Sequence, residues 1–483
     1  MEIEELAADG RPKAIFSLDI PAGKLRISSP PTVTSPQTGF SWLNRCLSPF
    51  LPAGYPSTVT PDYTPYQIYN SLQAFASTIA GLLASRAVFV GMGVGSEDAS
   101  LVTTMLLHIA QETIGRVATI VFAHRFSQRI EAEVKFYRFF ADIVNDTAFM
   151  LDCMSPAMST LGRVITLCVS NACRAVCGVA GGSSKAILCS HFAKAGNIGE
   201  LSAKGGSQET MVSLMGMWVG GVLVSKVHGT VATWSCLIPL LVFHLWANWK
   251  AVRSVCLSSL NTDRALIFFR GVLEGQVKDA QQVGAEETIL GRRTVSCGLR
   301  GLYLTRFRVG VGVNDLVACM YGRADHESRN LHDLIDLFHI FGEEEYVLWF
   351  DVDKREALIL LKDTATGPTQ ARSICHLLRC LRTQATTASA AEAHGREQGS
   401  RPIKRAIEPS ERLHDSQQRL SMSTDGYHRS IQLLLDTLHE NREQWSRIRD
   451  QAEEVGWDLG LTDLVKGQGA RIRLNDEEVK KVQ

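Results

Sequence analysis

The chain has 483 residues, with 50 basic and 50 acidic side chains, a formal net charge of zero and a pI near 7.2. This length is enough for two or three domains, and the neutral charge excludes a broad electrostatic attraction to nucleic acid. The twelve cysteines form no CxxC pair and no cysteine–histidine cluster with zinc spacing. We therefore expect free thiols in a reducing compartment and no metal site.

Residues 1–50 predict an irregular N-terminal arm. They begin with MEIEELAADG, which has the features of neither a secretory signal nor a transit peptide, and they include the Pro/Ser/Thr-rich segment SSPPTVTSPQTG. Four prolines in FLPAGYPSTVTPDYTPYQIYNSLQ then delay a regular helix until about Pro65, because proline fits only the first turn of a helix.

Residues 51–260 are the most apolar part of the chain and predict a helical bundle. The segment GTVATWSCLIPLLVFHLWANW (229–249) has no charged residue over about 20 residues, the length that crosses a bilayer core, and tryptophans lie toward its ends. In MVSLMGMWVGGVLVS, Gly216 and Gly220 form a face that lets helices approach closely. A helix is expected over 66–90, and four weaker candidate spans, each with polar groups, cover 101–123, 139–151, 161–181 and 211–225.

The charges between these segments alternate. GMGVGSEDAS is acidic, HRFSQRIEAEVKFYR is basic, and basic residues follow Trp249, with Lys226 the one misplaced charge. By the positive-inside rule, this pattern predicts about six membrane helices with both termini cytosolic. The polar segment HFAKAGNIGELSAKGGSQET (191–210) is then a cytosolic loop. The alternative is a soluble bundle of buried helices.

Ionisable residues inside the predicted spans suggest a polar chamber, because charges at membrane depth are costly and usually face a partner or water. Glu112 and Arg116 are four residues apart, as are Asp142 and Asp146, so each pair shares a helix face. The predicted chamber residues are Glu112, Arg116, Asp142, Asn145, Asp146, Arg174, Gln208 and Glu209.

Within this chamber we expect Arg116 or Arg174 to pair with the Asp142/Asp146 face across the bundle. Gln208 and Glu209 would cap the cluster at its cytosolic edge. The alternative is that these charges form structural ion pairs or lie partly outside the bilayer.

The remaining chain predicts a small α+β domain over 261–383, a linker over 384–425 and a terminal helical segment over 426–483. An amphipathic helix is expected over 261–283, a β-hairpin in EEYVLWFDVDKREALILLKD and a helix in TQARSICHLLRCLR. The low-complexity composition of 384–425 predicts disorder. The last helix is expected over 427–455.

No motif points to a cofactor or a catalytic centre. GVAGGSSKA has a lysine after serine where a phosphate-binding loop has it after glycine, and GMGVG lacks the strand–turn–helix context of a dinucleotide site. No nucleophile–base–acid set can be assembled. We therefore predict a protein without enzymatic activity or cofactor.

Several separate segments together resemble the root UVB sensitive (RUS) family. LPAGYPSTVTPDYTPYQIYNSLQAF, FADIVND, RAVCGVAGGSSKA and HFAKAGNIGELSAKGGSQET occur in the family's order, and LNTDRALIFFRGVLEG continues the match. The resemblance implies a membrane-associated helical protein, linked in plants to root and seedling responses to UV-B. It implies no established catalytic residue.

The expected fold class is therefore mainly α: a multi-pass helical membrane bundle with a small C-terminal α+β domain and a terminal helix. The first functional hypothesis is a carrier or channel for a small polar solute in the membrane of an intracellular organelle. The alternative is a membrane-tethered scaffold whose C-terminal domain recruits partners, and a lipid-modifying enzyme is a third option. Expected partners are the lipid bilayer and a further copy of the chain or of another family member, with no nucleic acid.

Overall fold

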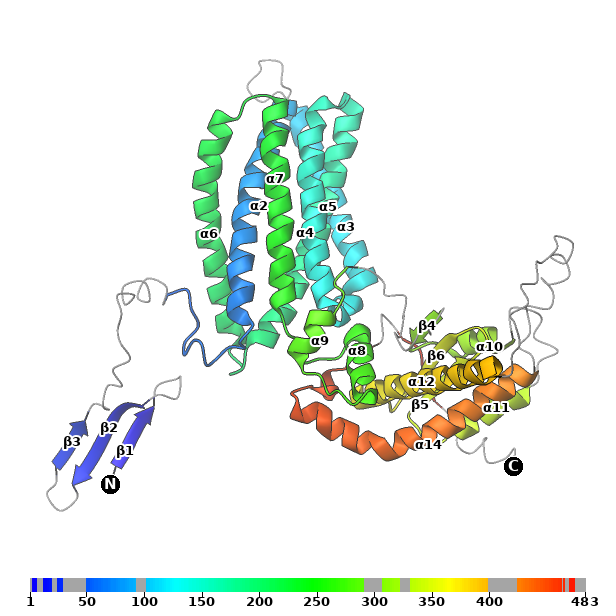
Figure 1. The fold of residues 1–483 in the computed structure, drawn as a ribbon. Coiled ribbons are helices and arrows are strands. Elements are labelled where there is room, and N and C mark those ends of the chain that lie inside the picture. The colour runs from blue at the N-terminus through cyan, green and yellow to red at the C-terminus, as the bar shows by residue number, and fades with distance from the viewer. Residues whose placement is uncertain are drawn as a thin grey trace, which may run out of the picture. The chain divides into compact units, whose positions relative to one another are not determined.

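The computed structural model describes residues 2–6, 12–19, 24–28, 49–92, 101–290, 306–321, 331–397, 424–462, 464 and 469–473. The chain divides into two compact units, an N-terminal unit of Met1–Val255 and a C-terminal unit of Cys256–Gln483. Figure 1 shows the elements of both, and each unit is described by itself. The sequence places this boundary at residue 260.

Three strands lie at the start of the N-terminal unit: β1 (Glu2–Leu6), β2 (Pro12–Asp19) and β3 (Lys24–Ser28). They form an antiparallel sheet in the order β1-β2-β3, with Phe16 opposite Ile3 on one side and Ile27 on the other. The expectation of an irregular arm is therefore wrong for these strands. Apolar residues alternate here over short segments, and the Pro/Ser/Thr-rich segment that suggested irregularity begins only where β3 ends.

Six long helices follow, and they coincide with the six predicted apolar segments. Their bounds are α2 Tyr63–Gly91, α3 Leu101–Ala132, α4 Val134–Met154, α5 Thr160–Phe192, α6 Ile198–Lys226 and α7 Thr230–Ser254, with a short 3-10 turn η1 (Ser155–Ala157) after α4.

The predicted loop over 191–210 is wrong for most of its length. Helix α5 continues to Phe192 and α6 begins at Ile198, so the connection is short and turns at Gly196, whose φ is +69°. The segment is polar, but it is rich in Ala, Leu, Glu, Lys and Gln, which are good helix formers. Polarity alone does not distinguish a loop from a helix end.

Helices α2, α4 and α7 pack against one another, while α6 packs on α2 and α3 packs on α5, which also lies against α4. Ala80, Ala84 and Leu237 are fully buried where α2 meets α7. The close approach predicted from Gly216 and Gly220 is confirmed. A Cβ atom at Gly216 would lie 2.9 Å from the Thr78 Cβ, and one at Gly220 would lie 2.7 Å from the Leu82 Cδ1.

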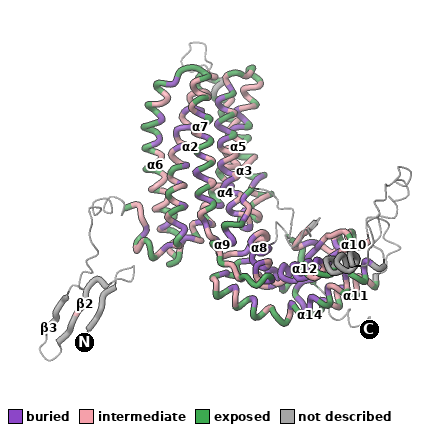
Figure 2. Tube along the Cα trace, viewed as in Figure 1, coloured by how far each residue is buried: buried purple, intermediate pink, exposed green. Residues whose placement is uncertain are grey.

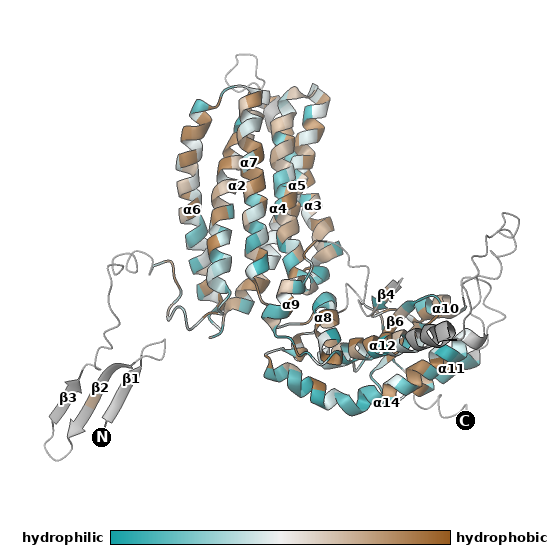
Figure 3. Ribbon diagram, in the orientation of Figure 1, coloured by the Kyte–Doolittle hydropathy of each residue, from teal (hydrophilic) through white to brown (hydrophobic). Residues whose placement is uncertain are grey.

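Among the described residues, three helices are long and apolar enough to cross a membrane by length and composition: α2, α5 and α7. Much of the bundle's apolar surface faces outward. Trp218 is 74% exposed and Val231 is 81% exposed, and Figures 2 and 3 show exposed and hydrophobic positions recurring along α6 and α7. The other three long helices carry more charged residues.

The C-terminal unit begins with two helices, α8 (Thr262–Leu273) and α9 (Ala280–Glu286), where one helix over 261–283 is expected. The break follows from Gly275, whose φ of +83° ends α8, and from Asp279, whose side chain starts α9 in a capping box.

The predicted hairpin is confirmed as β5 (Tyr346–Asp351) and β6 (Glu356–Lys362). Two further short strands, β4 (Arg306–Val309) and β7 (Arg471–Ile472), pair with β6 in parallel. Nearly all of β5 and β6 is buried, which explains why the hairpin has a continuous apolar sequence without alternation.

Helices α12 (Gly367–Glu397) and α14 (Thr424–Glu454) pack on this sheet and on each other, and α14 matches the predicted terminal helix. Shorter elements complete the unit: α10 Val313–Tyr321, α11 Leu331–Ile340 and the 3-10 turn η4 Leu459–Leu461. The predicted linker is wrong over 384–397, which belongs to α12, because its alanines and glutamates favour a helix. The rest of the predicted linker, 398–423, lies outside the described residues.

Candidate functional site

A group of polar side chains is buried where α2, α4 and α7 meet. We call it the polar network, and its members are Asn70, Gln73, Arg138, Asp142, Asp146, His244 and Asn248, each less than a tenth exposed. Polar groups are rarely buried at this density unless they satisfy one another.

Arg138 lies at the centre of the network. Its Nη1 donates to the Asp142 Oδ2 at 3.0 Å, and its Nη2 donates to the Asn70 Oδ1 at 3.1 Å. The Asn248 side-chain amide also donates to the Asp142 carboxylate. One ion pair on α4 thus connects all three helices, and both of its charges have partners.

His244 forms the second half of the network. Its Nε2 lies 2.8 Å from the Gln73 amide, and its Nδ1 lies 2.8 Å from the Asp146 Oδ1 at ion-pair distance, although the direction is not that of a hydrogen bond. The Gln73 amide is best satisfied with its nitrogen toward Asp142 and His244 and its oxygen toward Arg138. The His244 Nε2 then accepts a hydrogen bond, so a neutral His244 carries its proton on Nδ1, facing Asp146.

At its edge the network continues to two further helices through Glu209 of α6. The Asn70 Nδ2 donates to the Glu209 Oε1 at 3.2 Å, and the Lys185 Nζ donates to Oε2 at 2.7 Å. Both side chains are partly exposed. The neighbouring Gln208 instead donates to the Phe50 carbonyl at 2.6 Å and takes no part in the network.

A separate charge cluster joins α4 to α5. The Arg174 guanidinium pairs with the buried Asp152 carboxylate, and the Ser170 hydroxyl lies between them, donating to the Asp152 Oδ1 at 2.6 Å. Arg86 and Arg163 donate hydrogen bonds to backbone carbonyl oxygens at helix ends. Arg86, for example, donates to the Val224 carbonyl at 3.1 Å.

The structure therefore corrects the predicted chamber. Arg116 pairs with Glu112 on its own helix at 3.7 Å, and their side chains are 80% and 48% exposed, so neither lies in a chamber. Arg174 pairs with Asp152, and neither arginine meets the Asp142/Asp146 face. Asn145 donates to the Ser77 hydroxyl at 3.4 Å, outside the network. Of the eight predicted residues, the structure brings together Asp142, Asp146 and Glu209.

Sequence reasoning missed five members of the network: Asn70, Gln73, Arg138, His244 and Asn248. Their spacing carried a signal, because Arg138 and Asp142 are four residues apart, as are His244 and Asn248, the latter two on the most apolar helix. The sequence places Arg138 in a loop, because the predicted helix over 139–151 begins only after it.

The C-terminal unit holds a second buried polar group. The Tyr346 hydroxyl lies 3.0 Å from the His376 Nδ1, and the His376 Nε2 lies 3.0 Å from the Thr437 hydroxyl, which links β5, α12 and α14. Burial lowers the pKa of His376 to about 3, so its imidazole is neutral at physiological pH. Burial also raises the pKa of the Cys375 thiol to about 11, which keeps it protonated and poorly nucleophilic. These groups hold the core together and offer no catalytic set.

Across the described residues, no group of three or more His, Cys, Asp or Glu side chains is arranged to hold a metal ion.

These features define a class of protein: a bundle of long, outwardly apolar helices with a buried polar network, followed in the chain by a separate α+β unit. The family model for the vitamin B6 photo-protection and homoeostasis domain matches residues 36–276. The chain is 36% identical over 246 residues to RUS family member 1 of Dictyostelium discoideum, which covers 50% of this chain and 47% of that protein. It is 31% identical over 323 residues to protein root UVB sensitive 3 of Arabidopsis thaliana, covering 65% and 73% of the two chains.

The chain belongs to the root UVB sensitive family, as the sequence motifs predict. It is also 24% identical to the Arabidopsis thaliana protein root UVB sensitive 2, chloroplastic, with 66% of this chain and 69% of that protein covered. The match spans about half the length of the Dictyostelium relative. No solved structure matches the chain.

Proposed function

We propose that the bundle lies in the membrane of an intracellular organelle and carries a small polar solute, with the polar network as its binding site. The observation that supports this most directly is the network itself, which places two carboxylates, a guanidinium and an imidazole between α4 and the two apolar helices α2 and α7. Ionisable groups in such a setting are costly and typically mark substrate or proton pathways.

The outer surface supports a membrane position. The three most apolar helices bury only 22–33% of the residues in their most hydrophobic windows, and large apolar side chains such as Val242 and Trp246 are exposed. Exposed apolar side chains on this scale favour lipid over water as the surroundings. We propose that all six helices span the membrane, with α3, α4 and α6 tolerating their charges through the pairs described above.

The chemistry of the network suggests the class of solute. Asp142 and Asp146 suit a group that donates hydrogen bonds or carries positive charge, whereas Arg138 suits an anionic or hydroxyl group. The family model's description points to vitamin B6, whose vitamers combine a basic pyridine nitrogen with hydroxyl groups. Asp146 beside His244 is also a carboxylate–imidazole pair of the kind that relays protons in carriers.

The test is uptake into liposomes that contain the purified full-length protein, with a panel of small polar solutes that includes the B6 vitamers. Uptake of one solute class, abolished by Asp146→Asn and retained by Glu131→Gln, would support the proposal. Glu131 is a matched control because it is an exposed acid on α3 outside the network.

The scaffold alternative makes the opposite forecast. In that case no solute is taken up, neutral pairs in the helices are tolerated, and removal of residues 256–483 abolishes the cellular phenotype. Extraction of the protein from membranes by alkaline carbonate would refute the membrane position itself. For the orientation, we expect the turn between α3 and α4 and the C-terminal unit on the cytosolic side. The accessibility to an impermeant reagent of single cysteines introduced at exposed positions, such as Glu131, measures this.

A further inference from the structure

An apolar groove of about 890 Å³ lies among α3, α4 and α5, on the opposite side of α4 from the polar network. Its lining contains no charged side chain; typical lining residues are Ile114 and Phe122 of α3, Phe140 and Val144 of α4, and Val169 and Ala172 of α5. The volume is within the ~300–1,000 Å³ of pockets that bind small molecules. Among the described lining residues, only the Tyr137 hydroxyl and the cysteine thiols could form a hydrogen bond with a polar solute.

The groove is elongated. On α5 its lining extends from Val164 to Val176, which at 1.5 Å per residue corresponds to about 18 Å along the helix axis. Its aromatic rings gather at one end, where Phe122 and Phe140 stack with centroids 6.3 Å apart and Phe136 stacks on Phe140 at 5.8 Å. A long space with apolar walls fits a flexible hydrocarbon chain.

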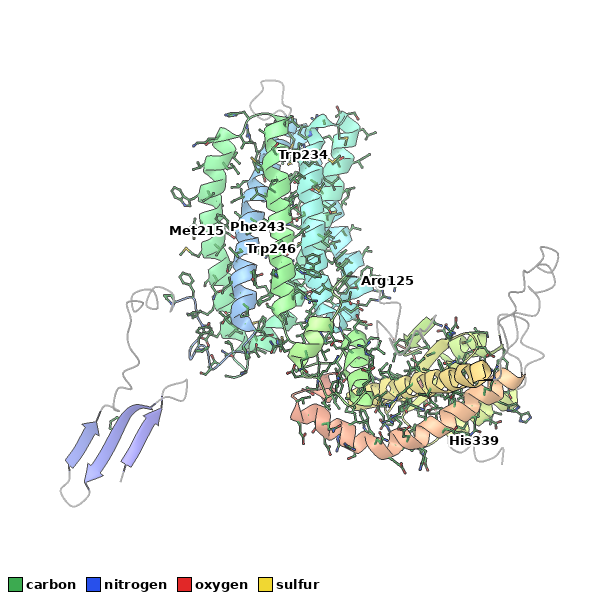
Figure 4. The ribbon with its side chains drawn as sticks, in the orientation of Figure 1. Arg125, Met215, Trp234, Phe243, Trp246 and His339 are labelled. Atoms are coloured by element: carbon green, nitrogen blue, oxygen red, sulfur yellow. The ribbon has the colours of Figure 1, made fainter. Side chains whose placement is uncertain are left out.

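Two arginines lie at this aromatic end. The Arg129 guanidinium is 5.9 Å from the centroid of the Phe126 ring, which lines the groove, and Arg125 lies one turn earlier on the same side of α3. Figure 4 shows Arg125 at the outer surface of the bundle. Glu131 follows Arg129 by two residues and therefore faces another side of α3.

We propose that the groove binds one acyl chain of a bilayer phospholipid, and that Arg125 and Arg129 bind its phosphate. An apolar groove with guanidinium groups at one end matches an amphiphile that has a phosphate next to its hydrocarbon chain. This proposal rests on the proposed membrane position of the bundle.

The test is native mass spectrometry of the delipidated full-length protein in detergent. It is titrated with dioleoyl-phosphatidylethanolamine and, separately, with dioleoylglycerol, which has the same chains and no phosphate. We expect one tightly bound phospholipid, and diacylglycerol bound about 25-fold more weakly because two basic contacts are lost. In the double variant Arg125→Gln/Arg129→Gln, binding of the phospholipid should fall to the diacylglycerol level. Lys226→Gln, an exposed cation on α6, is the matched control.

Ala172→Trp fills the groove and should reduce the binding of both lipids. Gly178→Trp, which adds the same side chain at an open position of α5 outside the groove, is its control. Equal binding of the two lipids, or unchanged phospholipid binding in Ala172→Trp, would overturn the proposal; so would binding of oleic acid in preference to the phospholipid. Carbonate extraction of the same variants distinguishes failure of the lipid site from failure of the proposed membrane position. A protein that resists extraction but binds no phospholipid refutes the groove site alone, whereas a protein that is extracted refutes the membrane position.

Discussion

Replacing Arg138 by leucine should strongly destabilise the N-terminal unit. Arg138 is buried, forms an ion pair with Asp142 at 3.0 Å and holds Asn70 through a second hydrogen bond. Its removal leaves the Asp142 carboxylate buried with only neutral partners, among them Asn248. Removing one member of a buried pair costs about 3–5 kcal/mol.

For a unit of this size each kcal/mol lowers the melting temperature by about 2–4 °C, so we expect Arg138→Leu to lower it by about 6–20 °C. The assay is thermal unfolding of the detergent-purified full-length protein, followed by tryptophan fluorescence. Glu131→Gln, an exposed acid, should change the melting temperature by less than about 2 °C, because surface substitutions usually alter stability by no more than about 0.5 kcal/mol.

The double variant Arg138→Leu/Asp142→Leu decides whether the two charges act as a pair. It removes both charges, so no uncompensated charge stays buried, and it should be more stable than Arg138→Leu alone. The reasoning is refuted if Arg138→Leu behaves like Glu131→Gln, or if the two substitutions are simply additive.

Three further outcomes follow from packing and burial. Gly216→Val should separate α6 from α2 and lower the yield of folded protein in fluorescence-detected gel filtration, because its Cβ would meet Thr78 at 2.9 Å, whereas valine at the open Gly221 on the same helix should be tolerated. His376 has a folded pKa of about 3, below its unfolded value of about 6.5. The stability it confers on the C-terminal unit is therefore complete above pH 6.5 and falls by up to about 1.4 kcal/mol per pH unit toward pH 3. Urea titrations of that unit at several pH values should show this slope, and a slope unchanged in His376→Phe would contradict it. Cys375 should resist maleimide in the native protein at pH 8 and react once urea unfolds it; labelling without urea would show that its site opens.

The positions of the six long helices could be predicted because each contains a run of apolar residues that is too long for a strand or a loop. Their ends could not. The apolar pattern predicts this helix only over 139–151, because Lys135 and Arg138 are typical of a loop. Helix α4 begins at Val134, and both of these charged side chains are buried. The end of α12 is equally hard to predict. Its last turns contain residues that favour a helix, but these residues form no apolar stripe that would mark them as part of one.

The partners within the site were predictable only where they lie on one helix. The spacing of Glu112 and Arg116 predicts their proximity, and the structure pairs them. The contact between Asp146 and His244 joins helices distant in sequence and depends on how α4 and α7 are rotated about their axes, which no local pattern specifies. The sequence therefore points to Arg116 or Arg174 as the partner of the Asp142/Asp146 face, whereas in the structure Asp142 pairs with Arg138.

Helix α4 connects the two proposed sites and also keeps them apart. Arg138, Asp142 and Asp146 follow one another every four residues along one face, toward α2 and α7. The residues that line the apolar groove, Phe136, Phe140 and Val144, follow the same four-residue spacing but are displaced by two residues, which places them on the opposite face. A lipid in the groove therefore cannot touch a solute in the network, and the most direct route for an influence of one on the other is a movement of α4 itself. A rotation of α4 large enough to open the network would also displace the aromatic end of the groove, so phospholipid binding and solute uptake should change together only in variants that move the helix.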